Sequence, residues 1–433
     1  MSDLLRLATA GSVDDGKSTL VGRLLYDTKS VLADTLDAVH RASADRGLTT
    51  PDLSLLVDGL RSEREQGITI DVAYRYFATP RRSFVLADTP GHVQYTRNTV
   101  TGASTAQLAV LLVDARHGVV EQTRRHVAVM GLLRVPRLVL AVNKMDLVDH
   151  DENTFWRIAK EFTGLTDALG YAEDAVTAIP VSAKQGDNVV LPSGNTPWYE
   201  GPTLLDHLES VPVEGADHDA PLRFPVQYVV RPRTDAHPDY RGYAGLVAAG
   251  TVRVGDEVDV LPDGQRTRVE GIDTFDGELR AAHVGQSVVL RLADDLGVAR
   301  GTLLAAPGAP EPVTEFDATV AWLHEKPLRP GARLLLKHGT RTVQAIVGAV
   351  THRLDTESLA LVEDPGELVI NDMGRVSLTV SEPLPLDGYD EVAATGSFLL
   401  VDPQAGDTLA AGLVGRSVLA ATLDGRGGPG QLG

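Results

Sequence analysis

The sequence predicts an α/β domain, with a mostly parallel sheet and helices on both faces, followed by two antiparallel β-barrel domains. Between residue 4 and about residue 210, short apolar runs alternate with helical patterns, which is typical of βαβ units. Beyond that point apolar residues alternate with a period of two and turn residues recur often, which favours antiparallel strands closed into barrels. A chain of 433 residues is also too long for one hydrophobic core, so two to three domains are expected.

The composition is that of an ordinary globular protein, with 43% hydrophobic and 23% charged residues. The absence of cysteine excludes disulfides, thiolate metal sites and cysteine nucleophiles. The sequence has neither a signal-peptide pattern nor the ~18 apolar residues needed to span a bilayer, so we expect a cytoplasmic protein with no membrane partner. The formal net charge of -19 disfavours a nucleic-acid partner, and the short basic runs at 81–82, 124–125 and 231–233 are interpreted as solvated surface.

Apolar runs read as the buried strands of the first domain lie at 5–10, 84–87, 109–114, 138–143 and 179–182. Each is followed by a polar or glycine-containing loop, and open α/β sheets bind ligands at the carboxyl ends of their strands. Breaks rich in proline, glycine and acidic residues lie at 211–220 and 305–312. We therefore predict an α/β domain over 1–213, β-barrels over 214–310 and 311–423, and a disordered glycine-rich tail over 424–433.

The first predicted strand leads into a motif that binds phosphates. The pattern G-x-x-x-x-G-K-[ST] is matched at every fixed position, with Thr19 directly after it, by Gly11, Ser12, Val13, Asp14, Asp15, Gly16, Lys17 and Ser18. Glycines let the backbone N–H groups surround a phosphate, and the N-terminus of the helix expected over 17–25 adds partial positive charge. A chance glycine-rich turn would not combine a strand before it with a helix after it. The motif predicts a nucleoside triphosphate but does not separate ATP from GTP.

The side chains of this loop have expected roles. Lys17 should reach the β- and γ-phosphates as a catalytic cation, and the Ser18 hydroxyl should bind Mg²⁺. Asp14 either binds a monovalent cation that neutralises phosphate charge or makes a local Asx turn, and both readings stay open.

A second motif predicts that the base is guanine. The predicted strand at 138–143 runs into Asn143, Lys144 and Asp146. The Asp146 carboxylate can accept hydrogen bonds from guanine N1–H and its N2 amino group, whereas adenine would leave that charge unpaired. Ser182, Ala183 and Lys184 follow the next strand, and the Ala183 backbone N–H is expected to point toward guanine O6. The first domain is therefore predicted to be a P-loop GTPase domain that binds GTP.

Two further segments predict the metal ligands and the hydrolytic residue. Asp88 ends the strand at 84–87 and should hold Mg²⁺ through water, while the Gly91 N–H should contact the γ-phosphate. Thr69 is the candidate for a second hydroxyl ligand and belongs to the predicted catalytic set. Loops of this kind order around a γ-phosphate and relax after hydrolysis. His92 follows Gly91, and we interpret it as the residue that positions the attacking water rather than as an exposed structural histidine.

These motifs, in this order, resemble the translation-factor class of GTPases. Residues 241–260 and 299–301 are similar to the first β-barrel of elongation factor Tu. The phosphate-binding loop of that protein reads Gly-His-Val-Asp-His-Gly-Lys, however, and Asp15 stands here in place of the second histidine. A more specific resemblance is to the GTPase subunit family of bacterial sulfate adenylyltransferase, and it is carried by the stretches at 12–29, 57–77, 88–105, 186–205 and 396–402.

The resemblance implies a function and a partner. GTPase subunits of that family pair with a smaller catalytic subunit that joins ATP and sulfate into adenosine 5′-phosphosulfate and pyrophosphate, and GTP hydrolysis drives this unfavourable reaction. The chain itself has no His-x-Gly-His or Ser-Gly-Gly-type loop for adenylyl transfer, and it has one phosphate-binding loop. The alternatives are an elongation-factor-like GTPase that delivers aminoacyl-tRNA and a regulatory switch that does not hydrolyse GTP. Asp15, Trp198 and Tyr199 favour the sulfate-activating family over the first alternative.

Overall fold

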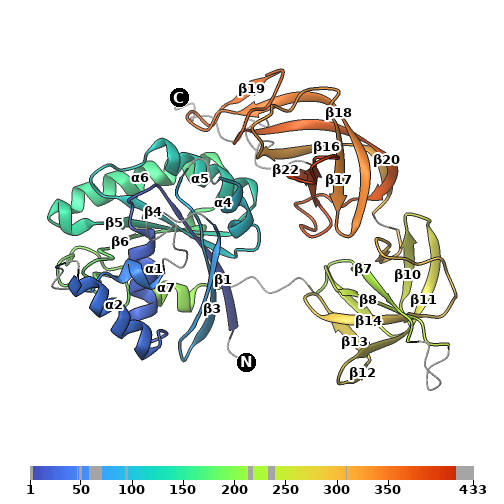
Figure 1. Cartoon of the computed structure of the whole chain (residues 1–433), viewed down its shortest axis with the longest axis horizontal. Helices are drawn as coiled ribbons and strands as arrows, with labels where there is room; N and C mark the ends of the chain where they lie inside the picture. Colours follow the sequence, from blue (N-terminus) through green and yellow to red (C-terminus); the bar gives the residue numbers. More distant parts are fainter. Residues whose placement is uncertain are drawn as a thin grey trace, which may run out of the picture. The chain divides into compact units, whose positions relative to one another are not determined.

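The computed structural model describes residues 3–45, 47, 51–57, 71–92, 96–212, 218–232, 239–308 and 310–415. The chain forms two compact units, one over residues 1–214 and one over most of residues 215–419 (Figure 1). The tail expected over 424–433 lies outside the described residues.

The first unit is built on a six-stranded sheet with the order β2-β3-β1-β4-β5-β6. Only β2 is antiparallel to its neighbour; the other pairings are parallel. The central strand β4 (Leu108–Asp114) is buried along its whole length, which agrees with its continuous apolar sequence. The strands are β1 (Asp3–Gly11), β2 (Ala73–Ala78), β3 (Arg82–Asp88), β4 (Leu108–Asp114), β5 (Arg137–Asn143) and β6 (Val176–Pro180).

Helices cover both faces of this sheet, with α1 and α7 on one face and α5 and α6 on the other (Figure 1). In α6 the Asp151 side chain accepts the Thr154 N–H at 2.8 Å and so caps the helix, while Phe155, Ile158 and Phe162 turn one face into the core. The helices are α1 (Lys17–Asp27), α2 (Ala33–Asp45), α4 (Thr96–Ala103), α5 (Glu121–Leu132), α6 (Glu152–Ala168) and α7 (Leu204–Ser210), with short 3₁₀ turns η1 (Leu53–Leu56), η3 (Met145–Val148) and η4 (Glu173–Ala175).

The second unit holds two closed antiparallel barrels. In the first, six strands form the ring β10-β15-β7-β8-β14-β11, which closes because β10 also pairs with β11. Its strands are β7 (Arg223–Val230), β8 (Gly242–Leu246), β10 (Glu257–Leu261), β11 (Gln265–Thr274), β14 (Ser287–Leu292) and β15 (Leu303–Ala305), with β12 (Gly277–Leu279) beside β11 and β9 (Thr251–Arg253) paired to β13 (Ala281–His283).

The second barrel follows the same plan, with the ring β17-β21-β22-β16-β20-β18 closed by the pairing of β17 with β18. Its strands are β16 (Pro312–Trp322), β17 (Arg333–His338), β18 (Arg341–Leu354), β20 (Met373–Pro385), β21 (Ser397–Val401) and β22 (Thr408–Val414), with β19 (Leu361–Glu363) at the side of β18. The predicted fold class is therefore confirmed. The predicted domain boundaries stay predictions.

A buried ion pair connects the two barrels of the second unit. Arg223 of β7 donates from Nε and Nη2 to the two carboxylate oxygens of Asp387, at 2.9 and 2.8 Å. The two side chains are only 4% and 3% exposed, and the Thr395 hydroxyl donates to the same carboxylate at 2.5 Å. Since an isolated buried charge is expensive, each partner stabilises the other only while the barrels stay docked.

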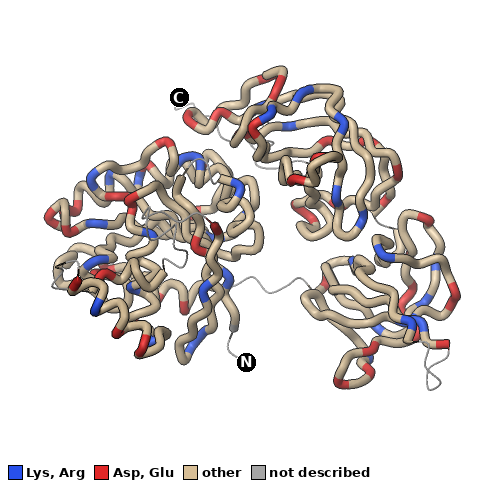
Figure 2. The backbone as a smooth tube through the Cα atoms, viewed as in Figure 1, with Lys and Arg blue, Asp and Glu red and all other residues tan. Residues whose placement is uncertain are grey.

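Along the backbone of both units, Lys and Arg positions are interspersed with Asp and Glu positions (Figure 2). Among the helices of the described chain, none combines the length and the apolar character that crossing a bilayer would need.

Candidate nucleotide-binding site

The phosphate-binding loop lies between β1 and α1, at the carboxyl edge of the sheet. Gly16 caps α1 with a φ of 92°, and a side-chain carbon at this position would collide with the Asn143 amide. Asp14 also has a positive φ, of 68°, which aspartate tolerates better than most residues. The sequence therefore places glycine where the backbone must turn into the left-handed region.

The Lys17 side chain is held by backbone carbonyl groups of the phosphate-binding loop. Its Nζ donates to the carbonyl oxygens of Gly11 and Ser12 at 2.9 and 2.8 Å, and the side chain is only 7% exposed. Burial lowers the pKa of Lys17, while the carboxylates of Asp88 and Asp15 oppose that shift. The loop thus holds a cation in place before any phosphate arrives.

Asp15 supports the loop from the side of the sheet. Its carboxylate accepts the Ser12 backbone N–H at 2.6 Å, and the residue is 6% exposed. Burial raises the pKa of this carboxyl group, while the Ser12 N–H and the Lys17 charge oppose the rise. This partly buried hydrogen bond closes the loop on itself.

The predicted magnesium ligands are only partly in view. Asp88 ends β3, is fully buried, and accepts the Thr9 hydroxyl at 2.9 Å. Ser18 lies half-buried at the start of α1, whereas Thr69 lies outside the described residues. The oxygen donors of Ser18 and Asp88 fit a magnesium ion, which prefers hydroxyl, carboxylate and phosphate oxygens.

Gly91 approaches the phosphate-binding loop so closely that it has no room for a side chain. A Cβ atom there would lie 2.6 Å from the Gly11 carbonyl oxygen and 2.9 Å from the Ser12 carbonyl carbon. The next residue, His92, is exposed. The start of the segment after β3 therefore packs directly against the phosphate-binding loop.

Asn143 joins the segment that follows β5 to the phosphate-binding loop. Its Nδ2 donates to the Asp15 carbonyl oxygen at 2.7 Å, and its Oδ1 accepts the Ala183 N–H at 2.9 Å. The Ala183 N–H expected to face guanine O6 is thus engaged by Asn143 in this structure, so its role toward the base stays a prediction. Asp146 lies half-buried in η3, on the same segment.

Lys144 makes a second connection. Its Nζ donates to the Asp14 carbonyl oxygen and lies 2.9 Å from the Asp114 carboxylate. Burial of Asp114 would raise the pKa of its carboxyl group, but hydrogen bonds from Arg116 and Lys144 outweigh this and hold the pKa well below its ordinary value. Asp114 therefore stays ionised and fixes the lysine.

Sequence reasoning missed two residues that organise this site. Asp114 ends a predicted strand, which was a usable signal, but it belongs to none of the recognised motifs. Arg23 of α1 donates to the Ala183 and Lys184 carbonyl oxygens at 3.2 and 2.6 Å and so fixes the third loop. No local signal connects Arg23 to a loop about 160 residues away.

Comparisons with known proteins identify the family. The elongation factor Tu GTP binding domain family matches residues 2–213, and the GTP-eEF1A C-terminal domain-like family matches residues 315–415. Sulfate adenylyltransferase subunit 1 of Methylorubrum populi is 50% identical over 423 residues, which cover 97% of this chain and 88% of the relative. The chain belongs to the sulfate adenylyltransferase subunit 1 family.

Other relatives agree with this assignment. The bifunctional enzyme CysN/CysC of Mycobacterium tuberculosis is 54% identical over 424 residues, covering 98% of this chain and 69% of the relative. Sulfate adenylyltransferase subunit 1 of Citrobacter koseri is 48% identical over 414 residues, which cover 95% of this chain and 86% of the relative. The resemblance drawn from the sequence is confirmed: this subunit 1 homologue is the GTPase subunit of an enzyme complex, and an aminoacyl-tRNA carrier is not favoured.

Proposed function

We propose that this subunit 1 homologue hydrolyses GTP with Mg²⁺ and thereby drives sulfate activation on a smaller catalytic partner subunit in the cytoplasm. On that partner, a sulfate oxygen attacks the α-phosphorus of ATP, a phosphosulfate anhydride bond forms, and pyrophosphate leaves. The observation that carries the proposal is the Asn143 bridge, which in a member of this family couples a phosphate-binding loop to the segment that we propose recognises guanine.

The residues of the first unit divide the work on GTP. Lys17 neutralises charge on the β- and γ-phosphates, and the backbone N–H groups around Gly16 surround the phosphate oxygens. Ser18, Thr69 and Asp88 would hold the magnesium ion, directly or through water. That ion supplies a positive charge that stabilises the negative charge growing on the phosphate oxygens during hydrolysis.

The base is selected by Asp146, whose carboxylate accepts the two donors that guanine has and adenine lacks. Lys144 and Asn143 hold this segment against the loop, so the carboxylate is positioned before the nucleotide binds. Ser182, Ala183 and Lys184 form the other wall of the pocket, fixed by Arg23.

His92 is proposed to orient the water that attacks the γ-phosphorus. It is exposed and follows the glycine that contacts the phosphate-binding loop. His92→Ala should keep GTP affinity within about threefold of wild type. It should slow hydrolysis by more than roughly tenfold, which corresponds to an activation free energy raised by at least about 1.4 kcal/mol. His40→Ala, at an exposed position on α2, is the matched control. Unchanged hydrolysis in His92→Ala would remove this residue from the mechanism.

The coupling to sulfate activation needs both subunits. The full chain is mixed with the purified smaller subunit, ATP and sulfate, and adenosine 5′-phosphosulfate is measured with and without GTP. We expect GTP to raise the yield and Lys17→Ala to abolish that rise. An equal yield with and without GTP would refute the assignment, and a nanomolar-range complex with charged tRNA would revive the elongation-factor alternative.

A further inference from the structure

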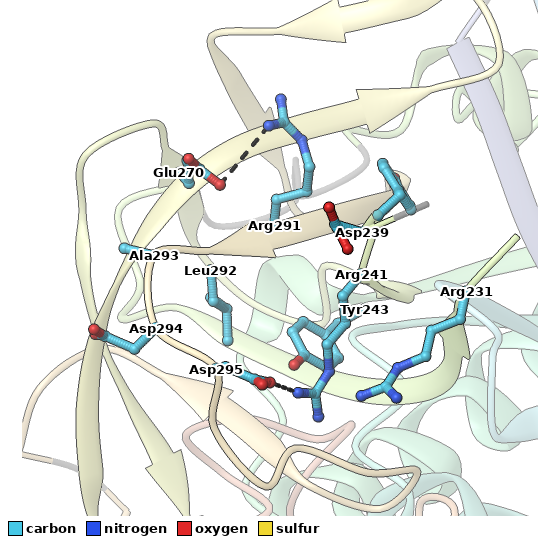
Figure 3. Close-up of a pocket in the computed structure, with 11 residues that line it drawn as sticks. Arg231, Asp239, Arg241, Tyr243, Glu270, Arg291, Leu292, Ala293, Asp294 and Asp295 are labelled. Carbon is cyan, nitrogen blue, oxygen red and sulfur yellow. Dashed lines mark ion pairs between the residues drawn. The ribbon is translucent and has the colours of Figure 1, made fainter. Parts of the chain in front are cut away.

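The first barrel contains a cavity of about 670 Å³ that the nucleotide site does not use (Figure 3). It opens between the end of β7, the start of β8 and the segment after β14. Its volume falls in the range of roughly 300–1,000 Å³ that is usual for small-molecule sites. Its arginines form two sets, and the carboxylates of Asp239 and Asp294 line it as well.

One set is already neutralised within the protein. Arg291 of β14 donates to Asp273 at 3.0 Å and to Glu278 at 2.8 Å, and its Nη1 lies 3.9 Å from Glu270. Tyr240 donates to the same Asp273 carboxylate at 2.7 Å. Three carboxylates around one guanidinium leave no demand for an anionic ligand on this side.

The other set centres on Arg241, which is rigidly placed. Its guanidinium lies 5.4 Å from the centre of the Tyr243 ring, and its Nη2 donates to the Leu296 carbonyl oxygen at 2.8 Å. Tyr243 is only 1% exposed, so the ring is a fixed platform. A second nitrogen, Nη1, pairs with the Asp295 carboxylate, while the buried Nε has no hydrogen-bond partner among the described residues.

Asp295 is the weak member of that pair. Its side chain is 86% exposed, whereas that of Arg241 is 22% exposed. Exposed ion pairs contribute little, because water competes for both partners. The carboxylate therefore marks a place where a negative group binds Arg241 and can be replaced by another negative group.

Arg231 brings a second cation to the same place. It follows β7, is exposed, and lines the cavity beside the Arg241 guanidinium (Figure 3). Within the described part of the chain no ion pair of Arg231 is found. The charges of both arginines act on the buried Tyr243 hydroxyl, where they oppose the rise in its pKa that burial causes. Asp239 and Asp294 also line the cavity, so the feature that favours an anion is local: two guanidinium groups lie side by side, and the carboxylate that pairs with one of them is exposed.

We propose that this half of the cavity binds a small molecule through a tetrahedral oxyanion, a phosphate or sulfate group, placed between the guanidinium groups of Arg231 and Arg241 in exchange for Asp295. Guanidinium groups present N–H donors in a planar fork that matches the oxygens of such a group. The cavity is larger than a bare ion needs, so a ligand that carries further atoms fills it better than an inorganic anion does.

Three probes distinguish the possible sources of the oxyanion: inorganic sulfate, inorganic phosphate and adenosine 5′-phosphosulfate. Each is titrated calorimetrically into the full chain, with GDP and Mg²⁺ present to saturate the nucleotide site and chloride used to fix the ionic strength. We expect at least one probe to bind, and adenosine 5′-phosphosulfate to bind more tightly than the two inorganic anions. Arg231→Gln should weaken binding by roughly tenfold or more. Asp295→Asn should tighten it severalfold, since it removes the competing carboxylate.

The matched control is Arg280→Gln, which removes the same charge from an exposed position of the same barrel. It should bind the probes like wild type. GTP hydrolysis should be unchanged in all three variants, so the test of the oxyanion site is independent of the test of the proposed GTPase function. The proposal is overturned if no probe binds or if Arg231→Gln and Arg280→Gln bind equally. It is also overturned if Arg231→Gln weakens only the complex with the partner subunit, which would make the cavity a protein-docking site.

Discussion

His126 should make the folded first unit sensitive to mild acid. This histidine lies on α5, is 1% exposed, and has its Nε2 3.0 Å from the Gln122 amide nitrogen. Its Nδ1 is buried and has no hydrogen-bond partner in the described part of the chain. Burial, together with the charges of Lys17 and Arg125, lowers the pKa of His126 to about 3. The imidazole is therefore neutral in the folded protein at any pH near neutrality.

The sign and size of the effect follow from proton linkage. In the unfolded chain the pKa of a histidine is about 6.5, so below that pH the unfolded state binds a proton that the folded state does not. Stability is therefore lost as the pH falls below about 6.5, and the loss continues until the folded pKa is reached. At pH 5 the gap of about 1.5 pH units, at about 1.36 kcal/mol each, gives a loss of about 2 kcal/mol.

The measurement compares wild type with His126→Gln, which keeps a polar side chain that does not titrate. Urea unfolding is followed at pH 7.5 and pH 5 by tryptophan fluorescence, because Trp156 and Trp198 lie in the first unit. We expect the wild type to lose about 2 kcal/mol more than the variant between the two pH values. Other titrating groups cancel in this difference. An equal pH dependence in both proteins would show that His126 is solvated or paired, and the reasoning would fail.

Three further substitutions test other features. Gly91→Ala places a Cβ atom 2.6 Å from the Gly11 carbonyl oxygen, and this overpacking costs about 1–3 kcal/mol. GTP affinity measured by calorimetry should therefore fall. Unchanged affinity would show that the segment after β3 moves freely. Asp146→Asn should shift preference from GTP to xanthosine triphosphate in a competition assay, since the xanthine O2 accepts a hydrogen bond; continued preference for GTP would misplace the guanine pocket. Arg223→Ala leaves the Asp387 carboxylate buried and unpaired, so denaturant unfolding should show a loss of about 3–5 kcal/mol, and replacing both residues with Met and Leu should restore most of it.

The strands of the sheet could be predicted where burial is continuous. The apolar runs at 109–114 and 138–143 differ by one residue from β4 and β5, because a strand buried on both faces is apolar throughout and ends at the first polar residue. The prediction of 179–182 was shifted relative to β6 (Val176–Pro180). The first three residues of β6 are only half-buried, so their sequence lacks the apolar pattern that marks a strand.

The candidate site was predictable to the extent that its chemistry is local in sequence. A motif such as residues 11–18 carries its own geometry, since glycine, lysine and serine must follow one another around the phosphates. The supports contributed by Arg23 and Asp114 are not local, because the fold alone brings α1 and β4 to the loops that they hold. The same limit applies to Arg231 and Arg241 of the first barrel: the basic run at 231–233 was interpreted as solvated surface, and nothing local connects it to Arg241.

The Asn143 amide also has a thermodynamic consequence. One side chain completes the hydrogen bonding of both the phosphate-binding loop and the segment at 182–184, so neither half can loosen without disturbing the other. Guanosine alone, or pyrophosphate alone, would have to order both connected segments while making contacts with only one of them. Their separate binding energies should therefore sum to less than that of the intact nucleotide. Loss of a single phosphoryl group should also weaken the hold of the segment that we propose binds the base.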